Sequence, residues 1–189
     1  MLRQFASYWT RCMILKGIIN QEKELIYIYG LELFFSTLSS VLSMILISLI
    51  TNKFLYGILF LFVTVPLKMT ANGYHAKTFL KCFLLTNIIF IIYICLISLY
   101  PLIHMGYLQV ILFIAAIIYI YIKAPVEHPK HKLSKQKREK NRLSAHIILA
   151  IDCLAVLVLI INEQQKAAYS FGIAIIIAAC IMIIKNKEE

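Results

Sequence analysis

The longest uncharged stretch of the chain runs from Cys82 to Ile122, 41 consecutive residues without Asp, Glu, Lys or Arg. About 20 apolar residues in a helix cross the hydrocarbon core of a bilayer, so two spans fit here, separated at Pro101. With 61% hydrophobic residues in 189, a soluble domain would have too little interior to bury them. The sequence therefore predicts an all-α, polytopic membrane protein with a single domain over residues 1–189.

Six apolar runs are expected to form membrane-embedded helices, at about residues 25–50, 54–67, 78–99, 102–122, 144–161 and 167–184. The second run has 14 residues, which leaves two alternatives open, a tilted crossing or a re-entrant helix. Residues 1–22 lack the long apolar core of a signal peptide. At helical spacing Phe5 and Trp9 fall on one side and Arg3 on the other. This pattern predicts an amphipathic interfacial helix ahead of the six spans.

The chain has 19 Lys and Arg residues against 9 Asp and Glu residues, a net charge of +10. Such an excess can indicate nucleic-acid binding, but in a membrane protein basic residues gather in cytoplasmic loops and set the topology. We therefore expect no nucleic-acid partner. Residues 123–143 are predicted to form a cytoplasmic basic loop. With six crossings and cytoplasmic termini, every basic residue except Lys53 and Lys166 lies inside, which is the arrangement expected in a bacterial cell membrane.

The five cysteines are scattered and odd in number, without a CxxC pair, so neither a disulfide framework nor a zinc site is expected. No other metal or cofactor is expected. Three of them lie deep in predicted spans and are interpreted as packing residues: Cys95, Cys153 and Cys180. Cys12, on the predicted interfacial helix, is at most a weak candidate for palmitoylation. Cys82 differs, because it falls in the first turns of a predicted helix close to Lys77 and Lys81. A helix amino terminus and nearby cations both favour the thiolate form.

The polar connector over residues 68–82 places His75 seven residues before Cys82. On a regular helix the two would stand about 10.5 Å apart along the axis, whereas a general base must approach the thiol within about 3 Å. A His/Cys dyad thus requires an irregular chain near His75, and the turn signal Asn72-Gly73 supplies one. On spacing alone, an interfacial His and a packed Cys without catalytic roles are the more common case.

The eleven residues Asn-Gly-Tyr-His75-Ala-Lys-Thr-Phe-Leu-Lys-Cys82 resemble the signature of the accessory gene regulator B family. The resemblance extends to chain length, the number of apolar runs and the segment Ala-Pro-Val-Glu-His-Pro over residues 124–129. This chain departs from the family pattern at Asn72, where Gly is common, and at Lys68, near which Arg is frequent.

The resemblance implies a membrane endopeptidase that processes autoinducing-peptide precursors in quorum sensing. By this resemblance, His75 is the general base and Cys82 the nucleophile. The cleaved AgrD-like propeptide would form an acyl-thioester and cyclise to a thiolactone or lactone. The expected partners are that propeptide and the lipid bilayer, and pairing as a homodimer is a further expectation.

Other polar residues of the chain are candidates for supporting roles. Glu32 is the favoured orienting acid for His75, with Asp152 and Glu127 as alternatives, and a dyad without a third member is also open. Asp152 could instead pair with a structural partner such as His146 or a hydroxyl group. Residues assigned to substrate binding or structural support are Lys68, Asn72, Gly73, Lys77 and Lys81. Two rival functions remain at this point, a peptide exporter or permease and a non-catalytic membrane scaffold.

Overall fold

The computed structural model describes residues 2–71, 79–100, 106–126 and 134–187. In these ranges the chain forms seven α-helices joined by turns and one short 3-10 helix, Gln21–Lys23. The helices are α1 (Leu2–Leu15), α2 (Glu24–Ile50), α3 (Phe54–Thr70), α4 (Phe79–Ser98), α5 (Gly106–Lys123), α6 (Lys135–Ile161) and α7 (Gln165–Lys187). Five of them are long and apolar enough to cross a membrane, and α3 is a shorter apolar helix. The predicted all-α, polytopic membrane fold is confirmed.

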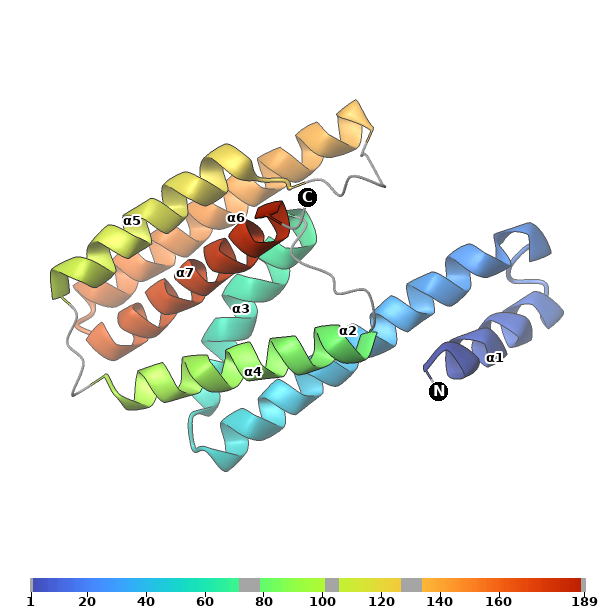
Figure 1. Ribbon diagram of the computed structural model, residues 1–189, viewed down its shortest axis with the longest axis horizontal. Coiled ribbons are helices and arrows are strands. Elements are labelled where there is room, and N and C mark those ends of the chain that lie inside the picture. Colours follow the sequence, from blue (N-terminus) through green and yellow to red (C-terminus); the bar gives the residue numbers. More distant parts are fainter. Residues whose placement is uncertain (1, 72–78, 101–105, 127–133, 188–189) are drawn as a thin grey trace.

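The helices from α2 onward form a bundle in which α5, α6 and α7 run side by side, with α3 behind α7 and the pair α2 and α4 along another edge (Figure 1). Contacts between helix ends show which of these helix ends lie at the same end of the bundle. Lys53, in the turn between α2 and α3, donates a 2.7 Å hydrogen bond to Ser98 at the end of α4. Lys166 at the start of α7 lies 5.5 Å from the ring centroid of Tyr56 in α3. We call this the Lys53 end of the bundle.

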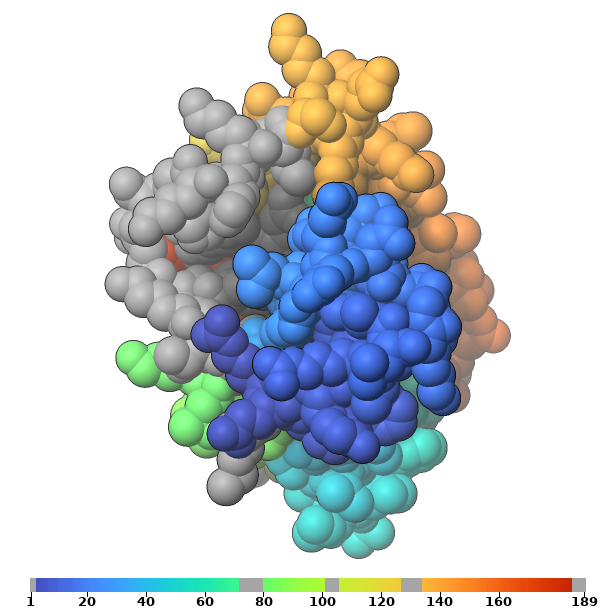
Figure 2. All heavy atoms as spheres, turned by 90° about the vertical axis from the view of Figure 1, so that its right-hand side faces the viewer, coloured from blue at the N-terminus to red at the C-terminus, as the bar shows by residue number. Residues whose placement is uncertain are grey.

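The opposite end brings together the carboxyl ends of α3 and α5, where the Val126 N–H donates to the Ala71 carbonyl at 3.1 Å. We call it the Cys82 end, because α4 also begins there. The first half of α2 extends beyond α4 and packs with α1 (Figure 1). Figure 2 shows α1 over these turns of α2, with the start of α6 rising beside them. The rings of Phe5 and Phe35 meet at 5.2 Å between centroids, so α1 is attached to α2 by aromatic packing.

The core between α3, α4 and α7 contains an aromatic cluster. The Phe60 ring centroid lies 5.2 Å from that of Phe90 and 4.5 Å from that of Tyr93. The buried Tyr93 hydroxyl donates to the Tyr56 carbonyl at 2.9 Å and lies 2.5 Å from the Ser170 hydroxyl. These bonds satisfy a polar group in an apolar setting, so Tyr93 ties the three helices together.

Two helix boundaries differ from those expected. Helix α6 starts at Lys135, inside the segment that the sequence suggested was a loop. Ser134 caps it by accepting a 3.4 Å bond from the Lys137 N–H, and the Lys, Arg, Gln and Glu residues that follow have high helix propensity. Helix α3 reaches Thr70 with Pro66 near its end, which makes it 17 residues long. The longer helix is compatible with a tilted crossing.

Asp152 lies near the middle of the apolar part of α6 and is 1% exposed. Neither carboxyl oxygen has a hydrogen-bond partner among the described residues. The pairing with His146 was wrong: the His146 Nε2 atom instead lies 3.0 Å from the Tyr121 carbonyl, and its ring stacks on that of Tyr121. Asp152 is therefore a buried polar group without compensation.

Replacing Asp152 with Val is expected to raise the free energy of unfolding by about 1–3 kcal/mol, since the uncompensated polar group disappears. Thermal unfolding of the detergent-solubilised protein measures the change. Asp152→Asn is the matched control: its amide also lacks partners, so we expect little gain. A destabilised Asp152→Val variant would mean that the carboxyl group contributes to folding.

Candidate active site

Cys82 lies in the first turn of α4, which begins at Phe79. The side chain is partly exposed, and the Cys82 carbonyl accepts a 2.7 Å hydrogen bond from the Thr86 hydroxyl one turn later. Its thiol is free. The amino-terminal turn of a helix carries a partial positive charge that favours an anionic sulfur. The position expected for Cys82 at the start of a span is thus confirmed.

A cation from a neighbouring helix approaches this sulfur. The Lys68 Nζ atom, in the last turn of α3, lies 3.8 Å from Cys82 Sγ. Lys68 is partly buried, which weakens screening by water. The ammonium group of Lys68 and the amino-terminal turn of α4 thus both lie beside the Cys82 sulfur.

The end of α3 has the local bonds needed to carry Lys68 to this position. The Thr70 hydroxyl donates to the Pro66 carbonyl at 2.9 Å, and the Ala71 N–H donates to the Leu67 carbonyl at 2.8 Å. These bonds continue the helix beyond Pro66. Without its last turn, α3 would end before Lys68 and the ammonium group would not be held over the sulfur.

Several predicted site residues lie outside the described residues: His75, Asn72, Gly73 and Lys77, together with Glu127. Their roles stay predictions. Lys81 is described, exposed and adjacent to Cys82 in the chain.

Glu32 is 8% exposed in the first half of α2. Ser43 of α2 donates to Asn87 of α4, which aligns these positions on two helices that both start at the Cys82 end. At 1.5 Å per residue, Glu32 lies about 16 Å from Ser43 and Cys82 about 8 Å from Asn87, both toward that end. Glu32 is therefore about two turns beyond the level of Cys82. Its role toward His75 stays a prediction.

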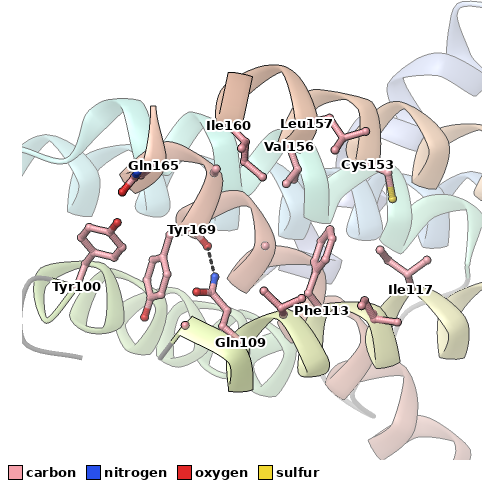
Figure 3. Close-up of a pocket in the computed structure, with 15 residues that line it drawn as sticks. Tyr100, Gln109, Phe113, Ile117, Cys153, Val156, Leu157, Ile160, Gln165 and Tyr169 are labelled. Carbon is pink, nitrogen blue, oxygen red and sulfur yellow. Dashed lines mark hydrogen bonds between the residues drawn. The ribbon is translucent and has the colours of Figure 1, made fainter. Parts of the chain in front are cut away.

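A cavity of about 480 Å³ lies between α5, α6 and α7. Figure 3 shows its mainly apolar lining, with Phe113 and Ile117 on one side and Val156 on the other. Gln109 donates a 3.4 Å bond to the Tyr169 carbonyl beside it. The cavity belongs to the Lys53 end of the bundle, away from Cys82. In the described parts of the chain, no three His, Cys, Asp or Glu side chains are grouped as metal ligands.

A comparison with family models matches residues 6–184 to the family described as Accessory gene regulator B. The chain belongs to the accessory gene regulator B family. Searches of curated proteins and of solved structures give no significant match. The family processes autoinducing peptides for quorum sensing and acts on AgrD-type propeptides. Membership of this family and the apolar helices together indicate a multi-pass membrane protein of that system.

The sequence indicated Lys68 as a residue for substrate binding or structural support, but it did not indicate that Lys68 contacts Cys82. The two residues are 14 positions apart and belong to different helices, so no periodicity within one helix joins them. The only signal in the sequence was a cation at the start of the polar connector and a cysteine at its end.

Replacing Lys68 with Met is expected to lower the alkylation rate of Cys82 by iodoacetamide at pH 7 by about three- to tenfold, because a nearby cation contributes roughly 1 kcal/mol to the thiolate. At pH 9.5 the rates should converge as solvent deprotonates the thiol. Peptide-resolved mass spectrometry measures modification of Cys82 alone. Lys68→Arg keeps the charge and should keep most of the rate. Equal pH 7 rates in Lys68→Met and wild type would contradict the pairing.

Proposed function

We propose that this protein is a membrane cysteine endopeptidase that cleaves an AgrD-type propeptide, with Cys82 as nucleophile and His75 as general base. The single observation that carries the proposal is the Lys68 ammonium group 3.8 Å from the Cys82 sulfur at a helix start. A packing cysteine has no need of a cation, whereas a nucleophilic one is more reactive as the thiolate.

In the first step, the Cys82 thiolate attacks a backbone carbonyl carbon of the propeptide, and a C–S bond forms. The C–N bond then breaks, and the imidazolium of His75 gives its proton to the departing amine. The carboxy-terminal fragment leaves, and the amino-terminal part stays attached as a thioester. Since a thioester is less stable than an amide, loss of the fragment draws the step forward.

In the second step, a thiol or hydroxyl within the same peptide attacks the thioester and gives its proton to His75, which is neutral after the first step. Its new bond to the acyl carbon replaces the bond to Cys82, the displaced thiolate is regenerated, and a thiolactone or lactone is released. A well-oriented internal nucleophile can reach an effective molarity of about 10⁵ M or more. Water competes for the thioester, and a site at the membrane edge limits its access.

The start of α6 offers a binding surface for the carboxy-terminal part of the substrate. Its exposed basic side chains lie at the same end of the bundle as Cys82: Lys135, Lys137, Arg138, Lys140 and Arg142. A cluster of positive charges attracts carboxylates. We propose that it binds an acidic propeptide tail and that this end faces the cytoplasm, as the positive-inside rule favours.

The direct test is to trap the thioester. Purified protein is mixed with an AgrD-type propeptide and examined as intact protein by mass spectrometry. We expect a covalent adduct with the mass of the amino-terminal fragment on wild type and on Cys153→Ala, but not on Cys82→Ala. An adduct on Cys82→Ala would overturn the assignment of the nucleophile.

A further inference from the structure

The residues that follow α5 are packed against the end of α3. Ala124 is 4% exposed, Val126 6% and Ala71 1%. The Val126 N–H donates to the Ala71 carbonyl at 3.1 Å, so a backbone hydrogen bond joins two segments that are more than 50 residues apart. Both ends of this bond are buried in the Cys82 end of the bundle.

The Ala71 carbonyl is one of the terminal carbonyl groups of α3 that have no partner within the helix. Terminal turns open easily when these groups are not held. Ala71 also donates to Leu67, and Lys68 belongs to the same last turn. A bond that holds Ala71 therefore limits the movement of the backbone that carries Lys68, whose Nζ atom reaches Cys82 Sγ.

We propose that Val126 is a positioning residue for the thiol: its backbone N–H fixes the last turn of α3 and thereby holds the Lys68 ammonium group at Cys82. The inference uses the proposed function only in treating Cys82 as the reactive cysteine.

The experiment compares iodoacetamide alkylation of Cys82 at pH 7 and pH 9.5 in the full-length protein, by peptide-resolved mass spectrometry. Val126→Pro removes the N–H and is expected to lower the ratio of the pH 7 rate to the pH 9.5 rate by about three- to tenfold. Val126→Ala, the conservative variant, keeps the donor and should change the ratio less than about twofold. A purely structural bond would not alter this ratio in protein that remains folded by circular dichroism.

A double variant separates action through Lys68 from an independent effect. If Val126 acts through Lys68, then Val126→Pro combined with Lys68→Met has the same ratio as Lys68→Met alone. The inference would be overturned if folded Val126→Pro had the wild-type ratio of alkylation rates. It would also be overturned if the double variant lowered that ratio by the product of the two single effects.

Ala71→Leu provides a second route in case Val126→Pro does not fold. The larger side chain separates the two buried segments and should lower the ratio of alkylation rates, as Val126→Pro does. An unchanged ratio would again overturn the proposal.

Failure of this inference is distinct from failure of the proposed function, because alkylation reports on the Cys82 sulfur alone. Propeptide cleavage by Cys82→Ala would remove the proposed function without affecting the alkylation result.

Discussion

Cys82→Ala is expected to lower kcat for propeptide cleavage at least about 10⁴-fold, because the covalent route is lost with its nucleophile. His75→Ala should reduce kcat by a similar factor, since the thiol then lacks its base and the leaving amine its acid. In the proposed mechanism the two residues act as one unit, so the double variant should be no slower than Cys82→Ala. Single-turnover cleavage, followed by mass spectrometry of the two fragments, measures these rates.

The matched control for this prediction is Cys153→Ala. Cys153 is another free cysteine of the chain and lines the apolar cavity at the other end of the bundle. Its loss should leave kcat within about twofold of wild type. Cleavage near the wild-type rate by Cys82→Ala or by His75→Ala would eliminate the dyad, and with it the proposed mechanism.

Gly57→Leu is expected to destabilise the protein by about 3 kcal/mol through overpacking between α2 and α3. A Cβ atom at Gly57 would lie 2.6 Å from Ser48 Cβ and 2.8 Å from Ser48 Oγ. Ser48 is 1% exposed and its hydroxyl donates to the Ile45 carbonyl at 2.7 Å. The neighbouring helix therefore has to move for any side chain to fit. Thermal unfolding in detergent measures the loss.

A compensating change tests whether the cause is this contact. Ser48→Gly combined with Gly57→Ala should recover most of the stability that Gly57→Ala loses alone, because the space then holds one Cβ atom. Gly30→Ala is the control: a Cβ atom there meets nothing within 4 Å. If Gly57→Leu unfolds at the wild-type temperature, α2 and α3 are not in close contact at this position.

The membrane helices could be predicted because their signal is local. A long uncharged apolar run satisfies its backbone only as a helix within the bilayer. The observed α4 (Phe79–Ser98) and α5 (Gly106–Lys123) occupy the two spans expected at about residues 78–99 and 102–122. The start of α6 was placed too late, because hydropathy marks where a helix enters the apolar region and not where it begins. Ser134 and the helix-forming polar residues after it determine that boundary.

The candidate site was only partly predictable from the sequence. The motif singled out Cys82, and a thiol at the start of a span follows from its place in the apolar pattern. The proximity of Lys68 did not follow, since it depends on how α3 and α4 pack. The missing partner of Asp152 was equally hidden, because His146 is directed to Tyr121 on another helix.

The amino-acid sequence alone determined that the chain is a bundle of membrane helices and which cysteine stands at a helix start, because both depend on the polarity of neighbours along the chain. Only the tertiary structure decided which cation meets that sulfur, which carboxyl group is left without a partner, and where the backbone after α5 holds the end of α3. These are contacts between distant segments, and their geometry is set by the packing of whole helices.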